Sequence, residues 1–218
     1  TQQGFKVGGF KAYIVSEIPA GSGLSSSAAL EILIGRIQSG LYNENSVSYV
    51  ELAKIGQFAE NEYFGKPCGL MDQLACASDS IVYIDFAYDG CPIIEEIDFD
   101  FEAHGYKLCI TSTGGSHADL TDEYAAVPAE MKAVAEIFGH DKLRGISAEQ
   151  LLEKAPEIRQ KAGDRALLRA LHFAGETERA KAQAEALKDG DFGEFLRLVK
   201  ESGDSSYMLL QNIYVGDT

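Results

Sequence analysis

The sequence predicts an α+β fold in which a first part that mixes helices and strands is followed by a helical second part. Three observations predict it. Runs rich in β-branched and aromatic residues fall within the first 112 residues, and segments with helically spaced apolar residues lie between them. Beyond Gly114-Gly115 the composition shifts to Ala, Leu, Glu, Lys and Arg, which are good helix formers. This order is typical of an α+β chain, with a domain boundary near residues 103–116.

The first part begins with a strand pattern and then changes to helical spacing. Residues 10–18 alternate apolar and polar side chains, which predicts a half-buried strand. From Leu24 to Leu41 the apolar residues recur at intervals of three and four, which predicts an amphipathic helix. Ser48 and Glu51 form a capping box that opens a second helix. A short helix from Leu70 to Ser78 and three β-rich runs at 81–87, 93–99 and 106–112 complete this part.

The second part is predicted to contain helices only. Residues 119–138 have a helical composition, and Pro128 is expected to open a second helical segment at its first turn. Three further stretches rich in helix formers, 147–154, 163–188 and 192–213, predict three more helices.

Composition and charge exclude several classes of function. The formal net charge of −15 argues against a nucleic-acid partner, since no basic stripe offsets it. No apolar run reaches the roughly 18 to 20 residues of a membrane helix, and the N-terminus has no secretory signal pattern. The four cysteines form no CxxC pair, and we interpret them as reduced thiols of a cytoplasmic protein. An acidic protein still binds a nucleotide through backbone N–H groups and a metal ion, so ATP remains a candidate ligand.

The stretch IPAGSGLSSSAALE, residues 18–31, joins the predicted strand to the predicted helix. A helix cap needs only one serine and a nearby glycine, whereas this stretch has three consecutive serines after Gly21 and Gly23. Glycines let the backbone approach a ligand closely, and the first N–H groups of a helix attract anions. The loop is neither a Walker A motif nor GxGxxG, because Ser26 occupies the third glycine position. On the residues alone, a simple helix cap and a phosphate-binding loop both stay open.

A second group of polar residues occurs in ENEYFGKPCGLMDQLACA, residues 60–77. Asp72 follows a Pro-Cys-Gly turn, and Glu60 precedes that turn. A single aspartate at this place is usually a helix cap. Two acids around a tight turn, downstream of a candidate phosphate loop, suggest that Glu60 holds Mg²⁺ and that Asp72 faces a substrate hydroxyl as a base or an orienting group.

Both stretches resemble motifs of one enzyme family. PAGSGLSSSAALE resembles the nucleotide-binding motif of the GHMP kinases, approximately PxGxGLxSSAA, at every fixed position. ENEYFGKPCGLMDQ resembles the galactokinase branch, with its pattern E-x-x-x-x-G-x-x-C-G-x-M-D-Q, and GGSHADLTDEYAAVPAEM resembles a divergent galactokinase segment. The resemblance spans most of the chain. It implies a nucleotide-binding N-terminal domain of the ribosomal protein S5 domain 2-like type at 1–105 and a mostly helical part of the C-terminal domain at 106–218, both incomplete.

The resemblance implies an ATP- and Mg²⁺-dependent kinase that phosphorylates galactose at its anomeric hydroxyl. Asp72 would be the catalytic aspartate, Gly69 would contact the sugar through its backbone, and Tyr124 would hydrogen-bond the sugar. Ser27, with Ser26 as a second candidate, and Glu60 would coordinate the metal. The residues implied to wrap the ATP phosphates are Gly21, Ser22, Gly23, Leu24, Ser25, Ser26 and Ser27.

Two family motifs are missing from this sequence. The sugar-binding motif, roughly GRxNxIGEHxDY, would precede the serine loop, and the glycine-rich GxGxGG motif would follow the helical part. We therefore expect a central piece of the enzyme that is inactive by itself. The alternatives are a kinase for N-acetylgalactosamine, galacturonate or arabinose, and a non-catalytic sugar sensor that resembles the enzyme.

Other polar residues have simpler explanations. His117, Asp119 and Asp122 have the composition of a metal cluster, but a Gly-Gly turn followed by a helix cap at Asp119 explains them better. Cys68 has no histidine partner in the pattern, so we expect a role in the tight turn rather than as a nucleophile. The acidic run 95–102 alternates with apolar residues and is expected to be the solvated face of a strand.

Overall fold

The computed structural model describes residues 3–18, 23–65, 68–88, 91–111 and 121–213. The chain forms two compact units, one of residues 1–84 with 94–116 and one of residues 85–93 with 117–218. Compact units and family domains need not coincide, so the domain limits at 105 and 106 stay a prediction. Among the described helices, none is long and apolar enough to cross a membrane.

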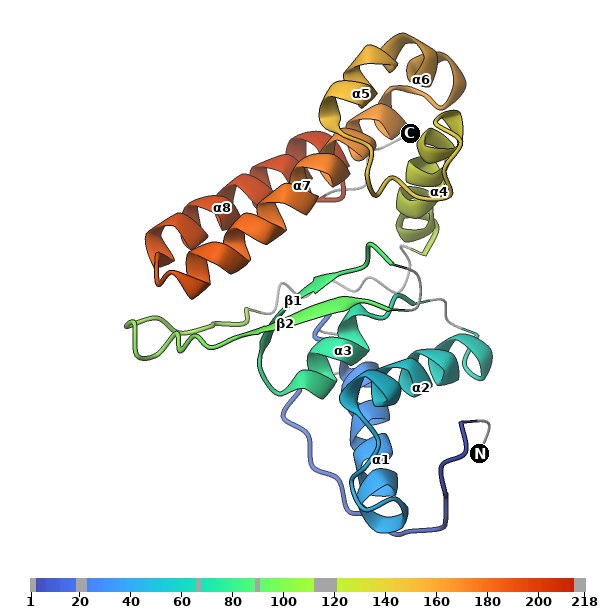
Figure 1. The fold of residues 1–218 in the computed structure, drawn as a ribbon, viewed down its shortest axis with the longest axis vertical. Coiled ribbons are helices and arrows are strands. Elements are labelled where there is room, and N and C mark those ends of the chain that lie inside the picture. The colour runs from blue at the N-terminus through green and yellow to red at the C-terminus, as the bar shows by residue number, and fades with distance from the viewer. Residues whose placement is uncertain (1–2, 19–22, 66–67, 89–90, 112–120, 214–218) are drawn as a thin grey trace. The chain divides into compact units, whose positions relative to one another are not determined.

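The first unit is built on three helices that contact one another, α1 (Ser26–Tyr42), α2 (Tyr49–Glu62) and α3 (Met71–Ser78) (Figure 1). The capping box at the start of α2 is confirmed, because Ser48 Oγ accepts from Glu51 N at 3.3 Å and Glu51 Oε2 accepts from Ser48 N at 3.1 Å. The apolar faces predicted from the helical spacing meet in one core. Its buried residues are Ile32, Val47, Leu52, Ala53, Leu74 and Ala77.

Two of the predicted strands exist and pair with each other. Strands β1 (Ile81–Asp85) and β2 (Ile93–Ile97) form a two-stranded sheet. Ile84 and Ile94 of this sheet pack against the helical core of the first unit. The hairpin thus adds one apolar face to the three helices.

The strands predicted at 10–18 and at 106–112 are wrong for the described residues. Residues 10–18 and 106–111 have no regular secondary structure, and their large apolar side chains other than the half-buried Phe10 are exposed, with Tyr13 at 94% and Leu108 at 89%. A strand exists only through the hydrogen bonds of a neighbouring strand, and no other described segment supplies them here. The alternating pattern is typical of strands, but the sheet of the described residues contains only β1 and β2 and neither of these segments.

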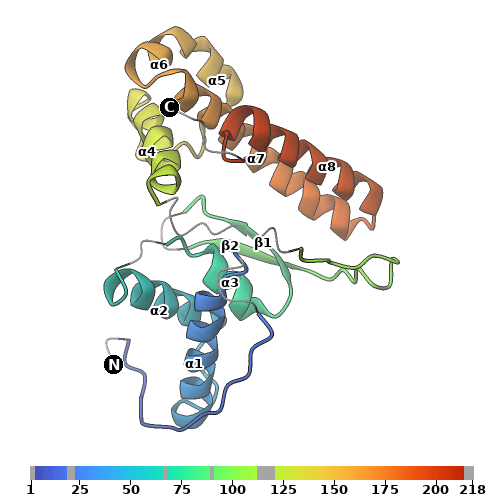
Figure 2. The same cartoon turned by 180° about the vertical axis from the view of Figure 1, so that it is seen from behind.

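The second unit is helical, as predicted. Helices α7 (Asp164–Lys188) and α8 (Phe192–Ser205) lie side by side in both views (Figure 1 and Figure 2), and α4 packs on α7. The other elements are α4 (Thr121–Ile137), α5 (Ala148–Glu153), α6 (Ala155–Lys161) and a π-helical turn, η1 (Ser206–Leu210). The buried core of this unit consists of Val134, Ala135, Leu143, Ile146, Leu151, Ile158, Ala166, Leu167 and Ala170.

Three details of the second unit differ from the prediction. Pro128 lies inside α4 and does not start a new segment; the helix accepts it although its nitrogen cannot donate to the carbonyl of Tyr124. Helix α6 was not predicted, although Pro156 in its first turn is a typical start signal. The last predicted helix ends as a π-helical turn, which closes at Gln211 in the left-handed conformation.

A buried arginine connects three elements of the second unit. Arg169 on α7 is 1% exposed, its Nη1 lies 3.0 Å from Glu130 Oε2 on α4, and its Nε donates to the carbonyl of Leu210 at 3.0 Å. Arg165, one turn earlier on α7, also donates to Glu130 Oε1, at 2.9 Å. A buried charge needs such partners, so these contacts fix the packing of α4, α7 and η1.

Candidate functional site

The N-terminus of α1 is arranged to accept an anion. Gly23 and Ser25 both have positive φ, 77° and 55°, and the Ser25 side chain makes no cap hydrogen bond to the first turn of the helix. The Ser25 side chain therefore does not occupy the backbone N–H groups of the first turn, which includes Ser26 and Ser27. A left-handed residue before a helix also gives the concave backbone that is typical of anion sites. Gly21 and Ser22 lie outside the described residues.

Glu60 and Gln73 form the buried part of the candidate site. Gln73 is 1% exposed and Glu60 is 4% exposed, although both side chains are polar. The Gln73 Nε2 group donates to Glu60 Oε2 at 3.1 Å and joins the end of α2 to the first turn of α3. Asp72 is the residue directly before Gln73, so the hydrogen bond from Gln73 to Glu60 links the two acids that flank the turn.

Helix α1 reaches the same place through Glu31. Its Oε2 accepts a hydrogen bond from the Gln73 Nε2 group at 3.2 Å. Ser27 lies four residues before Glu31 and therefore on the same face of α1, one turn nearer to the N-terminus. The predicted metal ligands Ser27 and Glu60 thus belong to helix faces that converge on Gln73.

The loop between α2 and α3 is fastened to α2 at Cys68. The backbone N–H of Cys68 donates to Asn61 Oδ1 at 2.8 Å, and the Cys68 carbonyl accepts from Gln57 Nε2 at 3.2 Å. Gly69 follows with an exposed backbone, and no atom of the described residues outside its chain neighbours lies within 4 Å of where its Cβ would be. An open backbone of this kind is suited to contact a ligand from its main chain.

Asp72 lies in the first turn of α3 and is exposed. An exposed carboxylate at a helix N-terminus is stabilised by the helix dipole and stays free to meet a ligand. Asp72 directly precedes Gln73, which hydrogen-bonds the buried Glu60. The contact of Asp72 with a substrate stays a prediction.

The cysteines near the site are not activated nucleophiles. The pKa of the Cys68 thiol is raised, first by burial and further by the carboxylate of Glu60, and the pKa of Cys76 is raised by burial and by Asp72. A raised pKa keeps a thiol protonated and unreactive at neutral pH. This agrees with the predicted role of Cys68 in the turn, and all four cysteines of the chain are free thiols.

Tyr124 lies in the first part of α4, in the second unit, and its side chain is exposed. Its predicted contact with a sugar stays a prediction. His117 and Asp119 lie outside the described residues, and Asp122 lies in the first turn of α4. Among the residues that the structure describes, no three His, Cys, Asp or Glu side chains gather as a metal cluster.

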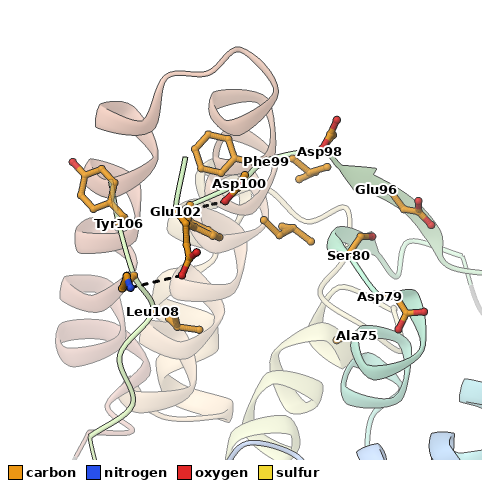
Figure 3. Close-up of a pocket in the computed structure, with 14 residues that line it drawn as sticks. Ala75, Asp79, Ser80, Glu96, Asp98, Phe99, Asp100, Glu102, Tyr106 and Leu108 are labelled. Carbon is orange, nitrogen blue, oxygen red and sulfur yellow. Dashed lines mark hydrogen bonds and ion pairs between the residues drawn. The ribbon is translucent and has the colours of Figure 1, made fainter. Parts of the chain in front are cut away.

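A wide groove of roughly 1200 Å³ lies elsewhere in the first unit (Figure 3). Acidic side chains line it, among them Glu96, Asp98 and Asp100, and Lys107 is its single basic lining residue, 4.0 Å from Glu102. Such a groove repels the phosphates of a nucleotide. None of the predicted site residues lines it, so we place the candidate site at α1 and Gln73 rather than here.

The two predicted metal ligands, Glu60 and Ser27, carry oxygen atoms, which are the ligand atoms that Mg²⁺ prefers. Their binding of a metal stays a prediction. The buried Gln73 Oε1 atom has no hydrogen-bond partner among the described residues, so a further polar group is needed beside these carboxylates. Neither Gln73 nor Glu31 was predicted as a site residue from the sequence, although Glu31 lies one helical turn after Ser27.

Comparison with known proteins gives a consistent picture. Residues 1–80 match the family model of the GHMP kinases N terminal domain. The chain is 38% identical over 195 residues to a galactokinase of Actinobacillus pleuropneumoniae serotype 5b (strain L20), and 32% identical over 204 residues to a galactokinase of Clostridium tetani (strain Massachusetts / E88). These alignments cover 88% and 92% of this chain but 49% and 51% of the relatives.

A solved structure shows the same fold. The crystal structure of Lactococcus lactis galactokinase complexed with galactose matches with a TM-score of 0.64 at 24% identity, over 88% of this chain and 49% of that one. The predicted α+β fold of the GHMP kinase type is thereby confirmed. The chain spans about half the length of the curated relatives it matches.

Proposed function

We propose that the chain is part of a sugar kinase of the galactokinase type, because residues 1–80 match the family model of the GHMP kinases N terminal domain and the chain is 38% identical to a galactokinase over 195 residues. The reaction is the transfer of the γ-phosphoryl group of ATP to the anomeric hydroxyl of galactose, which gives galactose 1-phosphate. The observation that carries the proposal is the hydrogen bond between Gln73 and Glu60, because it joins the predicted metal ligand to the helix turn that bears Asp72.

The ATP phosphates are proposed to bind at the N-terminus of α1. The uncapped first turn and the left-handed Ser25 support this position. Backbone N–H groups supply most of the attraction there, which explains how a chain with a net charge of −15 binds a polyanion. The residues proposed to surround the phosphates are Gly21, Ser22, Gly23, Leu24, Ser25, Ser26 and Ser27.

Mg²⁺ is proposed to bind the hydroxyl of Ser27 and the carboxylate of Glu60. When bound, the ion neutralises charge on the phosphate oxygens during transfer. The burial of Glu60 keeps its carboxylate away from bulk water, so that its charge attracts a cation more strongly than an exposed carboxylate does. Gln73 donates to one of its oxygens and restricts its rotation.

Asp72 is proposed to act at the sugar. Its exposed carboxylate accepts the proton of the anomeric hydroxyl or orients that hydroxyl toward the phosphate, while the backbone at Gly69 contacts the sugar. Tyr124 is proposed to donate a further hydrogen bond. Phosphoryl transfer depends chiefly on positioning and on charge stabilisation, and the hydrogen bond from the Cys68 N–H to Asn61 Oδ1 serves the first of these.

We propose galactose as the substrate, rather than another sugar, because a protein of the same fold was crystallised with galactose. The test is a panel of sugars assayed with ATP and the full-length protein, meaning a chain of the relatives' length that contains these 218 residues. Phosphorylation of galactose well above N-acetylgalactosamine, galacturonate and arabinose is expected. A preference for one of those three would replace the substrate, and no transfer to any sugar would favour the non-catalytic sensor.

The proposed compartment is the cytoplasm. All four cysteines are free, and Cys91 and Cys109 are exposed. Exposed free thiols persist in a reducing compartment, which supports the proposal.

A further inference from the structure

Gln73 occupies a position that the motif assignments leave without a role. It is buried at the meeting point of α1, α2 and α3, and its single amide nitrogen lies within hydrogen-bond distance of Glu31 and Glu60, at 3.2 and 3.1 Å. The Cys68 sulfur lies at 3.6 Å from the same nitrogen. One amide therefore contacts a side chain from each of the two other helices and one from the loop between α2 and α3.

We propose that Gln73, supported by Glu31, is a positioning residue that holds the Glu60 carboxylate in the orientation that binds the metal. An amide nitrogen has two N–H donors, and the two carboxylate oxygens lie closer to it than its third acceptor, the Cys68 sulfur. The bond to Glu60 Oε2 fixes the plane of that carboxylate, and the bond to Glu31 Oε2 fixes the amide itself. This inference rests on the proposed function, since it assumes that Glu60 is a magnesium ligand.

The chemistry of the amide explains why a glutamine suits this position. A lysine or arginine would also hold Glu60, but its charge would neutralise the carboxylate and repel a cation. A neutral amide orients the carboxylate without itself neutralising the negative charge. Partners of this kind, which contact a metal ligand from behind, typically contribute a factor of about 10 to 100 in metal affinity.

The packing around Gln73 leaves little room for another arrangement. A Cβ atom on Gly56 of α2 would lie 3.1 Å from Glu31 Oε2 and 3.3 Å from Gln73 Cγ. The backbone of α2 thus passes directly against both side chains, which only a glycine permits without a shift of its neighbours. The same anchoring holds Asp72, because Asp72 and Gln73 are consecutive residues of the first turn of α3.

The test measures the binding of Mg²⁺ by the full-length protein in the presence of a non-hydrolysable ATP analogue, by calorimetry. Gln73→Leu removes the amide and keeps a side chain of similar size. We expect its affinity for Mg²⁺ to fall about 10- to 100-fold, and turnover to recover at high Mg²⁺ concentration. General damage to the fold would not be reversed by added Mg²⁺.

Gln57→Leu is the matched control. Gln57 is also a half-buried glutamine of this region, and it hydrogen-bonds the carbonyl of Cys68 rather than Glu60. Its replacement is expected to leave the Mg²⁺ affinity within about twofold of the wild-type value, below the effect of a partner of a metal ligand. An equal loss in both variants would mean that the loop, and not the amide on Glu60, sets the affinity, and would overturn the proposal.

Two further variants separate the possible failures. If Glu60→Gln leaves the Mg²⁺ affinity unchanged, Glu60 is not a ligand and the proposed metal site is wrong. If Glu60→Gln weakens binding while a folded Gln73→Leu does not, the metal site stands and the positioning role is wrong. Should Gln73→Leu fail to fold, Glu31→Gln decides: weaker Mg²⁺ binding, smaller than the loss in Glu60→Gln, supports the role, and unchanged binding overturns it.

Discussion

The side-chain amide of Gln73 donates a 3.1 Å hydrogen bond to the carboxylate of Glu60, and both side chains are buried. The two residues are separated by 13 positions and by the loop that carries Cys68 and Gly69. Their bond holds the end of α2 against the start of α3. Asp72, the residue before Gln73, is thereby joined through one hydrogen bond to the helix that carries Glu60, and the proposed phosphoryl transfer depends on such positioning.

The ion pair between the buried Arg169 and the half-buried Glu130 predicts a large effect on stability. Glu130→Ala leaves the buried guanidinium without its carboxylate, 3.0 Å away in the wild-type protein. We expect the free energy of unfolding to fall by about 3 to 5 kcal/mol, as for other broken buried ion pairs. Urea denaturation followed by circular dichroism measures it.

Glu136→Ala is the control for Glu130→Ala, since Glu136 lies on the same helix and pairs with Lys132 at 3.8 Å on the surface. Exposed pairs of this kind contribute little to stability. If both variants lost the same stability, the buried pair would have no special importance.

His172 predicts a loss of stability in mildly acidic solution. Its Nδ1 lies 2.9 Å from Ser205 Oγ between α7 and α8, and burial lowers its pKa below the ordinary value of 6.5. The unfolded chain therefore binds a proton at His172 more readily than the folded chain does. The stability that neutral His172 contributes is fully present above pH 6.5 and is lost as the pH falls below that value.

Urea denaturation at a series of pH values between about 5.5 and 8 tests this slope. His172→Gln is expected to flatten it, whereas His140→Gln, at an exposed histidine, is expected to retain it. An unchanged slope in His172→Gln would assign the pH dependence to other groups.

Two glycines in helices predict opposite effects of the same substitution. Gly203 on α8 has no atom within 4 Å of the Cβ position, so Gly203→Ala is expected to stabilise the protein by up to about 1 kcal/mol through helix propensity. Gly56→Ala gains the same propensity but places its Cβ 3.1 Å from Glu31 Oε2, and we expect no net gain. Melting temperatures of the two variants decide this, and equal stabilisation would contradict the tight packing at Gln73.

The 218-residue chain alone is predicted to be inactive. It spans about half the length of its relatives, and its segments 10–18 and 106–111 expose strand-type apolar side chains that no described strand covers. A coupled assay with ATP and galactose is expected to give no phosphorylation with this chain and normal phosphorylation with the full-length protein. Turnover by the shorter chain would show that these residues contain a complete site.

The parts that sequence reasoning found are those determined locally. The capping box of Ser48 and the apolar spacing of α1, α2 and α7 depend on residues within a few positions of one another, and these helices are present as predicted. The strands at 10–18 and 106–112 depend on partners distant in sequence, which the pattern does not contain.

In the candidate site, too, the residues that a local sequence pattern marks were predicted, and those that depend on distant contacts were not. Asp72 and Glu60 were found because two acids flank a tight turn, which is visible in the sequence. Gln73 was not found, because a buried glutamine has no periodic or charge signal, and only the packing of three helices shows its contacts.

The most direct test of the account is the activity of Asp72→Asn in the full-length protein. Asparagine keeps the shape of aspartate but neither accepts a proton nor carries a charge, so turnover of ATP and galactose is expected to fall by at least about a hundredfold. ATP binding, measured by calorimetry, is expected to persist, since the proposed phosphate site lies at the N-terminus of α1. Asp79→Asn, at the other end of α3, serves as the control and is expected to remain active. Turnover near the wild-type rate in Asp72→Asn would contradict the proposed site.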